Sequence, residues 1–409
     1  MDSFPEKSLS ESRLPVVIVG GGPVGLFLGL CLLRRGISCR ILERRTAIDP
    51  HSRSIGIHPV SLDLFDRLEI TEPFLSEGVQ IRKGYAFTDR RRVGTFNFDS
   101  CPPPHRYVLS LPQSRTEALL ESAIEKFDRN CLSRGAEVSA IRNQSDFAEA
   151  DVHHRSGKQT LRCRWLVGCD GLRSRVRTGA GIGLELINYD DTYMMADFED
   201  DSGFEEDAAI WIHKEGLVES FPMPAGQRRW VVKTDRYHES PDVELLRNIV
   251  EQRTGFDLFR SDCNLESSFG VRYQVANTFF CNRVVLAGDS AHVVSPIGGQ
   301  GMNLGWINAW HLAKALEVAV QSDRTCLVKS DEKTGLTGDA GVPVIHNVLA
   351  GWSKKSRKRA ARAGKRAEFN MKLGRKQHWP LIKKAAVYAI VRTPLRHIMA
   401  RIFSMRWLG

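Results

Sequence analysis

Residues 14–25 read LPVVIVGGGPVG, an apolar and largely β-branched run that ends in a glycine-rich turn. The run is typical of a buried strand, and the apolar stretch from Leu26 to Arg35 after the turn is typical of a helix. A second short strand is expected from Ile37 to Leu42. These pieces form a βαβ unit, so we predict an α/β fold that opens on a Rossmann-like nucleotide-binding domain.

The glycines of this turn, Gly20, Gly22 and Gly25, have the GxGxxG spacing. Such glycines permit a tight turn, let a pyrophosphate approach the backbone and let the helix pack on the strand. Glu43 follows the second strand, where an acidic residue accepts hydrogen bonds from an adenosine ribose. The pattern predicts a cofactor with an ADP moiety, and by itself leaves FAD and NAD open.

Two later strands also end in turns that carry an aspartate. Residues 164–171 (RWLVGCDG) place Asp170 after one strand, where it fits the cap of a helix as well as a cofactor site. Residues 283–289 (RVVLAGD) place Asp289 after another, and residues 288–305 (GDSAHVVSPIGGQGMNLG) continue into a glycine-rich loop. We expect Asp289 to bind ribityl hydroxyls, and the loop and the helix after it to lie against a flavin ring.

The segment between these two turns reads as a sheet, with short strand-like runs at residues 208–213, 217–223 and 229–234. The nucleotide-binding domain is therefore expected to be discontinuous, with an inserted antiparallel β-sheet substrate domain and a C-terminal helical region. The expected boundaries are 14–85, 105–185 and 275–318 for the first domain, 86–104 and 186–274 for the sheet domain, 319–342 for a loop or insertion, and 343–409 for a basic helical region.

The basic charge of the chain is confined to its C-terminal part. The 409 residues carry a net charge of +10, whereas residues 353–409 contain 17 Lys or Arg and one acid, Glu368. The rest is mildly acidic, and no recognition fold accompanies the basic segment, so we expect no nucleic-acid partner. The nine cysteines have irregular spacing without a CxxC pair, which predicts reduced thiols, a cytoplasmic protein and no metal site.

Neither the polar N-terminus nor any later stretch has the apolar run of a signal peptide or a membrane-spanning helix. Residues 379–391 and 395–408 combine apolar and aromatic side chains with Lys and Arg. Such a region can lie on an anionic membrane, or it can cover the body of the protein with its charges solvated. Peripheral membrane contact and simple packing both stay open.

Together the three motifs resemble the fingerprints of the class A flavoprotein monooxygenases, the family of para-hydroxybenzoate hydroxylase, the ubiquinone-biosynthesis hydroxylases and kynurenine monooxygenase. The resemblance spans residues 14–318, in the family's order, and identifies the first domain as an FAD-binding domain. Residues 51–57 (HSRSIGI) and 111–117 (LPQSRTE) also resemble cofactor-binding stretches of that family. The cofactor-binding residues that the resemblance implies are Gly20, Gly22, Gly25, Glu43, Arg44, Arg53, Gln113, Asp170, Asp289, Pro296, Gly299, Gln300, Gly301, Met302 and Asn303.

The activity that the resemblance implies is a monooxygenation that depends on O2 and on NADPH or NADH. The nicotinamide would bind transiently and reduce FAD, which would then form a C4a-hydroperoxide that hydroxylates or epoxidises a small aromatic or lipophilic substrate. A general base that deprotonates a phenol would raise its reactivity. His58 and His292 are candidates for that base by position only, and the sequence assigns no catalytic residue.

Three other functions share parts of the pattern. A flavin-dependent halogenase should show a WxWxIP stretch, and none of the eight tryptophans forms one. An FAD-dependent reductase of a prenylated or isoprenoid substrate would consume nicotinamide without inserting oxygen. A non-catalytic prenyl-binding escort protein is disfavoured by the intact aspartate motifs.

The substrate itself is not defined by the sequence. The inserted sheet offers apolar and aromatic side chains to line a pocket, and half of them are expected on the far face of their strands. These side chains are Trp211, Phe221, Met223 and Trp230.

Overall fold

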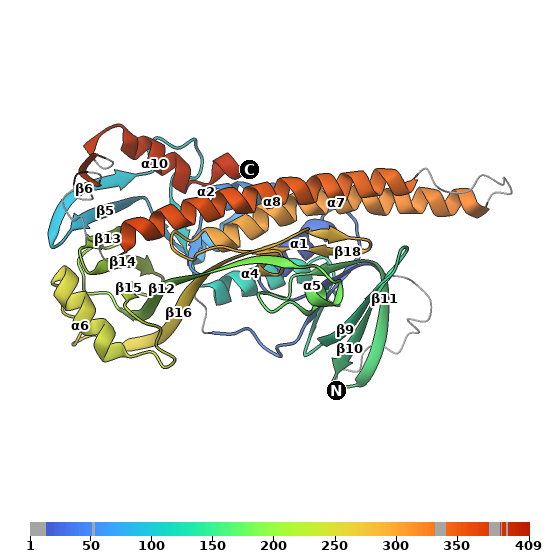
Figure 1. Cartoon of the computed structure of the whole chain (residues 1–409), viewed down its shortest axis with the longest axis horizontal. Coiled ribbons are helices and arrows are strands. Elements are labelled where there is room, and N and C mark those ends of the chain that lie inside the picture. Colours follow the sequence, from blue (N-terminus) through green and yellow to red (C-terminus); the bar gives the residue numbers. More distant parts are fainter. Residues whose placement is uncertain (1–13, 51–53, 332–340, 376–384, 386, 390–391) are drawn as a thin grey trace.

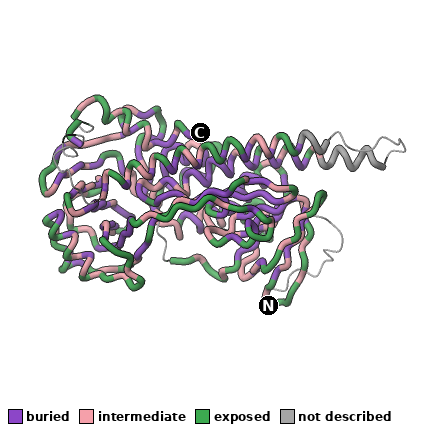
Figure 2. Tube along the Cα trace, viewed as in Figure 1, coloured by how far each residue is buried: buried purple, intermediate pink, exposed green. Residues whose placement is uncertain are grey.

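The computed structural model describes residues 14–50, 54–331, 341–375, 385, 387–389 and 392–409. They form two large β-sheets side by side, and two long helices, α7 (Gln300–Asp331) and α8 (Gly341–Gly374), run next to each other along the molecule (Figure 1). Buried residues follow the strands of both sheets and the inner sides of this helix pair (Figure 2). The inner sides of this helix pair, where the structure describes their burial, therefore form part of the core.

The first sheet contains the βαβ unit that the sequence predicts. Its central strand, β1, pairs in parallel with β2 and with β11, and β11 pairs in parallel with β18. Helices cover this parallel part, which is why its strands are continuous apolar runs. Its strands, in pairing order, are β17 (Phe280–Cys281), β18 (Val284–Leu286), β11 (Gly157–Gly168), β1 (Leu14–Val19), β2 (Cys39–Glu43) and β8 (Leu132–Arg134), with β10 (Ala148–His154) and β9 (Glu137–Asn143) joined to β11.

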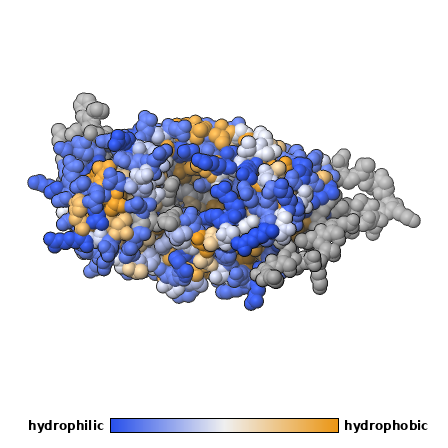
Figure 3. Space-filling view, turned by 90° about the horizontal axis from the view of Figure 1, so that it is seen from below, coloured by the Kyte–Doolittle hydropathy of each residue, from blue (hydrophilic) through white to orange (hydrophobic). Residues whose placement is uncertain are grey.

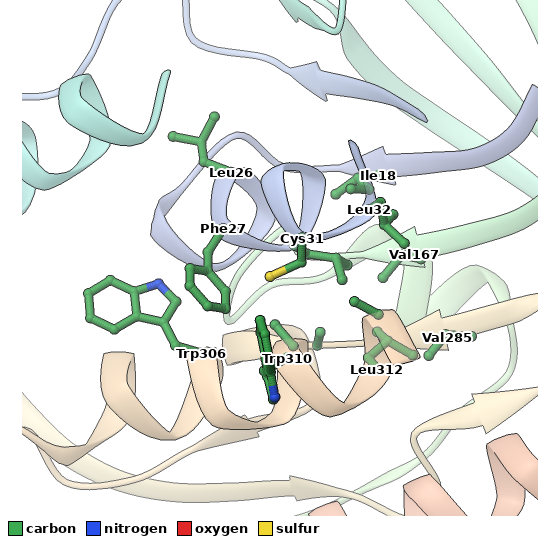
Figure 4. Close-up of a cluster of buried hydrophobic side chains, with 14 of the residues drawn as sticks. Ile18, Leu26, Phe27, Cys31, Leu32, Val167, Val285, Trp306, Trp310 and Leu312 are labelled. Atoms are coloured by element: carbon green, nitrogen blue, oxygen red, sulfur yellow. The ribbon is translucent and has the colours of Figure 1, made fainter. Parts of the chain in front are cut away.

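Helix α1 (Pro23–Leu33) is buried on nearly all sides, because it lies between the first sheet and α7 (Figure 4). The ring of Phe27 lies 6.1 Å from that of Trp306 on α7, measured between centroids. Gly305 permits this approach, since a Cβ there would lie 2.5 Å from Cγ2 of Val24. The N-terminal ends of α1 and α7 are thus held against each other.

The second sheet is antiparallel except where β13 pairs in parallel with β5. Helix α6 (Val243–Thr254) packs on one face of it, while α8 and the loop before α7 meet the other. Its strands, in pairing order, are β19 (His292–Val293), β16 (Cys263–Ala276), β12 (Leu184–Glu199), β15 (Gln227–Thr234), β14 (Gly216–Met223), β13 (Ala208–His213), β5 (Lys83–Thr88) and β6 (Arg91–Asn97).

A small third sheet and several short helices complete the described fold. The third sheet contains β3 (Gly56–Ile57), β7 (Val108–Ser110) and β4 (Val79–Ile81). The remaining helices are α2 (Pro59–Arg67), α3 (Thr71–Glu77), α4 (Gln113–Glu125), α5 (Arg175–Gly179), α10 (Leu395–Phe403) and the 3-10 turns η1 (Gly288–Ser290) and η2 (Arg406–Leu408).

The fold class and the helical C-terminal region are confirmed, but the loop expected at residues 319–342 is wrong where the structure describes it. Helix α7 continues to Asp331 and α8 already begins at Gly341, while residues 332–340 lie outside the described residues. The two helices stabilise each other, since Val320 of α7 and Leu349 of α8 are both buried. Packing thus overrides a polar composition that reads as a loop.

The sheets also divide the chain slightly differently from the expected boundaries. Strand β5 begins at Lys83, before residue 86, and β19 brings His292 and Val293 from the expected FAD-binding segment into the second sheet. Among the described helices, none is both long enough and apolar enough to cross a bilayer.

Candidate active site

The turns after β1, β11 and β18 meet at the carboxyl ends of these parallel strands. A Cβ on Gly20 would lie 2.3 Å from the carbonyl oxygen of Cys169, and a Cβ on Gly25 would lie 2.0 Å from the carbonyl oxygen of Gly20. A Cβ on Gly288 would lie 3.2 Å from Val24 at the start of α1. Only glycine permits these approaches, which gather the three motifs at the edge where α/β sheets bind ligands.

The N-terminus of α1 is free to bind an anion. The helix begins at Pro23, no side chain caps it, and its first turn contains no acidic residue. A Cβ on Gly22 would meet no atom within 4 Å, so the backbone faces open space there. The unpaired N–H groups and the positive end of the helix dipole suit a pyrophosphate.

Glu43 closes the turn from the end of β2. Its Oε2 accepts a hydrogen bond from the Gly21 N–H (2.7 Å), and its Oε1 accepts from the backbone N–H and the Nε of Arg45 (2.9 and 3.0 Å). Burial acts to raise the pKa of Glu43, but these hydrogen bonds and the Arg45 charge outweigh it and lower the pKa. Glu43 is therefore a carboxylate that can accept from ribose hydroxyls.

The arginine that contacts Glu43 is Arg45, whereas the sequence singled out Arg44. Arg44 is exposed and makes no hydrogen bond or ion pair with any described residue. Arg53 lies outside the described residues. Nothing in the sequence distinguishes which of the two adjacent arginines after β2 contacts Glu43.

Asp170 and Gln113 lie at the edge of the site with their side chains already engaged. Asp170 accepts from the Ser174 hydroxyl (2.5 Å) and from the Val176 N–H (3.1 Å) at the start of α5, so it acts as a helix cap. Gln113 is the first residue of α4 and donates from Nε2 to Oε1 of Glu117 (2.8 Å). Their contact with a cofactor stays a prediction.

The carboxyl of Asp289 is available to a ligand. Its side chain is exposed to solvent and accepts no hydrogen bond from any described residue. The surrounding protein nevertheless raises the pKa of Asp289 to about 6 by desolvation. A carboxyl that is accessible and yet enclosed lies in a recess, and hydroxyl groups entering that recess would find an unused acceptor.

The glycine-rich loop, residues 296–301, leads into α7, whose residues contact the η1 turn that holds Asp289. Gly298 and Gly299 have positive φ values of +88° and +64°, which favour glycine. Pro296 is exposed, Gly299, Gly301 and Met302 are half-buried, and the Gln300 side chain is buried.

The side chain of Asn303 holds this loop in place. Its Oδ1 accepts from the His58 N–H (2.8 Å) and the Ser61 hydroxyl (2.7 Å), and its Nδ2 donates to the carbonyls of Gly56 (2.9 Å) and Gly299 (2.8 Å). All of its polar side-chain atoms are therefore engaged, and a cofactor can meet Asn303 through the backbone alone.

Both histidines that were candidates for the base, His58 and His292, are buried and hydrogen-bonded within the protein. His58 is buried, its Nδ1 lies 2.6 Å from the carbonyl oxygen of Phe403 in α10, and burial lowers its pKa. His292 is buried with Nε2 3.0 Å from the Asn308 amide nitrogen, and burial lowers its pKa to about 4. Each is thus a neutral packing residue, and His58 also links the C-terminal helix to the glycine-rich loop.

The face of the second sheet that meets the loop is mainly apolar. The buried apolar side chains of this face form a cluster with Ile297 of the loop and Met371 of α8, and we call it the loop-facing cluster. Half of the four side chains offered for a pocket were expected on the far face of their strands, and Trp211 and Trp230 do lie in the core against α6. The loop-facing cluster consists of Tyr193, Met195, Leu217, Val231, Phe269, Val271, Ile297 and Met371.

An open cavity of about 350 Å³ lies between the second sheet and the first domain. One of its sides carries Arg229, which pairs with both oxygens of the buried Asp197 (2.6 and 2.7 Å). The molecule is visibly hollowed near the middle of one face (Figure 3). The cavity is lined by Pro50, Pro112, Ser114, Asp197, Met223, Gln227, Arg229 and Asn264.

Sequence reasoning missed Glu219, which lies on the loop-facing side of β14. Its side chain is 7% exposed, and its carboxylate accepts no hydrogen bond from any described residue. The signal was present in the strand, where Glu219 interrupts the alternating apolar positions Leu217, Phe221 and Met223. A charged residue in such a run is either an error of assignment or a functional group.

The described residues contain one cluster with the geometry of a metal site, Asp63, Asp66 and His105. Its members are already paired, since Nε2 of His105 lies 2.7 Å from Asp66 and the Arg406 guanidinium binds both oxygens of Asp63. A cation would have to displace Arg406, so we assign no metal to the cluster.

The chain matches the family model described as "FAD binding domain" over residues 13–330. It is 32% identical over 316 residues to an uncharacterised aromatic compound monooxygenase of Bacillus subtilis (strain 168), covering 76% of this chain and 62% of the relative. It is 29% identical over 374 residues to pentachlorophenol 4-monooxygenase of Sphingobium chlorophenolicum, covering 87% of this chain and 68% of the relative. The chain thus spans about two thirds of the length of these relatives.

Among solved structures, p-nitrophenol 4-monooxygenase from Pseudomonas putida DLL-E4 superimposes with a TM-score of 0.82. The match covers 97% of this chain and 98% of the other, at 20% sequence identity. At this level of identity the likeness shows a shared fold, including the two-sheet arrangement and the helical C-terminal part.

Proposed function

Because the chain belongs to the FAD binding domain family, and with it to the class A flavoprotein monooxygenases, we propose that it binds FAD and inserts one oxygen atom from O2 into a small aromatic substrate, with NADPH or NADH as reductant. The observation that carries this proposal is that an uncapped helix N-terminus, the Glu43 carboxylate and the unused Asp289 carboxyl all lie at the carboxyl ends of parallel strands in one sheet.

The residues present fit FAD from one end of the cofactor to the other. The N-terminus of α1 would hold the pyrophosphate, Glu43 the adenosine ribose and Asp289 the ribityl hydroxyls. The backbone of Gly299 to Met302 would lie along the flavin ring. Arg44, Arg53, Gln113 and Asp170 are proposed as further contacts around the adenosine and phosphate groups.

Bound FAD would supply the redox chemistry that reduces O2, and the protein would supply position and shielding. The N-terminus of α7 would stabilise negative charge on the reduced ring system. The loop-facing cluster would exclude water and hold the substrate against the ring. Whether the product is a hydroxylated ring or an epoxide depends on that substrate.

The test is NADPH and NADH oxidation by the FAD-reconstituted protein with a panel of phenols, quinols and quinolones, scored by product mass. A gain of one oxygen atom in a product is the expected result. Nicotinamide oxidation that yields a reduced product without oxygen insertion would instead support an isoprenoid reductase. Protein that stays colourless after reconstitution with FAD would overturn the enzyme proposal and favour an escort protein.

We expect Asp289→Asn to weaken FAD binding by about tenfold or more, because it removes a charged acceptor for cofactor hydroxyls. Asp99→Asn is the matched control, since Asp99 is exposed outside the recess. Equilibrium dialysis with FAD measures both variants. Equal affinity of Asp289→Asn and the parent protein would remove Asp289 from the cofactor site.

We propose the cytoplasm as the compartment, because the described cysteines form no disulfide. Peripheral membrane contact is a second proposal, supported by Leu395, Ile398 and Trp407, which are exposed apolar residues beside Arg396 and Arg401. Sedimentation with vesicles of anionic lipid should retain the protein, and vesicles of neutral lipid should not. Failure to sediment with either would leave these helices a packing role alone.

A further inference from the structure

Two polar atoms on the loop-facing side of the second sheet lack partners. The hydroxyl of Tyr193 is sealed from solvent and makes no hydrogen bond with any described residue. The carboxylate of Glu219 likewise accepts no hydrogen bond from any described residue, and its side chain is only 7% exposed. An unpaired buried polar group costs about 1–3 kcal/mol. Because two such groups lie on one face, that face has hydrogen-bonding capacity that a bound molecule can complete.

Glu219 lies in apolar surroundings between the cavity and the loop-facing cluster. Across the strands it is paired with Ile210 on β13 and with Val231 on β15, and Val231 is paired with Met195 on β12. The Arg229 side chain that lines the cavity lies two residues along β15 from Val231, which is about 7 Å. A molecule that passes from the cavity towards the loop would therefore meet Glu219.

The other charged groups on this side of the sheet carry one excess positive charge, since Arg229, Lys233 and Arg375 outnumber Asp191 and Asp197. Arg229 pairs with Asp197, and Nη2 of Arg375 at the end of α8 lies 2.6 Å from Asp191, which also lies 3.5 Å from Nζ of Lys233. Burial alone raises the pKa of Glu219, to about 7. The titratable and charged groups around it are Asp191, Asp197, Arg229, Lys233 and Arg375, with the tyrosines Tyr189 and Tyr193.

We propose that Glu219 is a recognition residue whose carboxylate accepts a hydrogen bond from a hydroxyl on the aromatic ring of the substrate. The inference deepens the proposed monooxygenase function and rests on it. An aromatic ring suits the site, since the neighbouring walls are apolar and Tyr193 and Phe269 already stack at 5.5 Å. A neutral hydroxyl suits it better than a cation, because the basic side chains named on this face, without Glu219, already exceed the acidic ones by one positive charge.

The experiment measures binding without turnover, on the FAD-reconstituted protein under anaerobic conditions. The probes are 2-naphthol, its methyl ether, and 2-(aminomethyl)naphthalene, titrated against the flavin absorption spectrum at pH 6 and pH 8. The variants are Glu219→Gln, Glu219→Asp as a conservative rescue, and Glu266→Gln as a control. Glu266 is exposed on β16 and outside the loop-facing cluster.

The parent protein should bind 2-naphthol about tenfold more tightly than the ether, because a hydrogen bond to a charged acceptor is lost in the ether. This preference should be larger at pH 8 than at pH 6, since the carboxylate prevails above its pKa. Glu219→Gln should reduce the preference towards one and remove its pH dependence. Glu219→Asp should recover part of it, and Glu266→Gln should leave it unchanged.

The inference would be overturned if the parent protein bound 2-naphthol and its methyl ether with equal affinity. It would also be overturned if Glu219→Gln kept the parent protein's preference for 2-naphthol over the ether. Tighter binding of the amine than of 2-naphthol would also overturn it, in favour of a cationic substrate. These outcomes are separate from the product assay. Oxygen insertion with no hydroxyl preference contradicts the role of Glu219 alone, whereas a hydroxyl preference without oxygen insertion contradicts the proposed function.

Discussion

The two faces of the second sheet are built from alternating residues of the same strands, yet each buries a charged group, Arg228 or Glu219, that only one of them provides with partners. On the α6 side, Arg228 is fully buried and its guanidinium is paired with Asp200 (2.7 Å), the Ser220 hydroxyl (3.2 Å) and backbone carbonyls. On the loop-facing side, Tyr193 and Glu219 remain unpaired among the described residues. On the α6 side the buried guanidinium of Arg228 is thus completed by the protein itself, although the Ser268 hydroxyl on that side is unpaired, whereas on the loop-facing side the Glu219 carboxylate is left for a ligand.

The largest expected effect is the loss of stability when one buried phenylalanine on each face of the sheet is replaced by alanine. Phe198→Ala should lower the free energy of unfolding by about 4 kcal/mol, because Phe198 is fully buried against α6. Phe269→Ala on the loop-facing side should cost at least about 1 kcal/mol less, since its surroundings can be filled by solvent or ligand. Urea denaturation measures both. Equal losses would mean that the two faces are equally rigid cores.

A smaller effect, confined to the loop-facing side, should appear in the pH dependence of stability. Burial raises the pKa of Glu219 to about 7, so its contribution is fully present at acidic pH and is lost as pH rises through that value. Glu219→Gln should match the parent protein at pH 4.5 and exceed its unfolding free energy by about 3 kcal/mol at pH 9. Parallel pH profiles for the two proteins would rule out a desolvated carboxyl at this position.

The smallest expected effect is on stability when a single hydroxyl is removed from each face, and we expect the two changes to have opposite signs. Ser220→Ala should cost about 1 kcal/mol, because Ser220 accepts a hydrogen bond from Arg228 in the α6-side core. Tyr193→Phe should be neutral or stabilise by about 1 kcal/mol, since it removes an unpaired hydroxyl. Thermal unfolding of the ligand-free variants measures both. A loss of stability in Tyr193→Phe would reveal a partner for its hydroxyl and weaken the contrast between the faces.

The cofactor side of the molecule could be predicted from the sequence because its backbone is what matters there. Gly20 and Gly25 are required by contacts that no side chain permits, so their spacing carries the geometry. Apolar runs that end in turns were likewise enough to predict β1, the turn that carries Asp289, and the three strands β13 to β15. Where a side chain has two uses, as with Asp170 and Asn303, the sequence could not tell a cofactor contact from a structural hydrogen bond.

The substrate side could not be predicted to the same depth, because it depends on which face of a strand each residue occupies. Trp211 and Trp230 turn towards α6, while Glu219 turns towards the loop. A register shift of one residue would reverse these assignments, and nothing local in the sequence fixes the register. The paired helices around residues 319–342 were missed for a related reason, since α7 and α8 stabilise each other only after the chain has folded back.

The link from His58 to the C-terminal helix α10 sets an order of events during synthesis of the protein. The turn after β1 leaves the ribosome first. Asn303, which anchors the glycine-rich loop to His58, is made 245 residues after His58. The carbonyl of Phe403 reaches His58 after a further hundred. If domains fold as they emerge, the pyrophosphate end of the site exists long before the ring end, and a nascent chain would gain its full affinity for the cofactor only once Phe403 has left the ribosome.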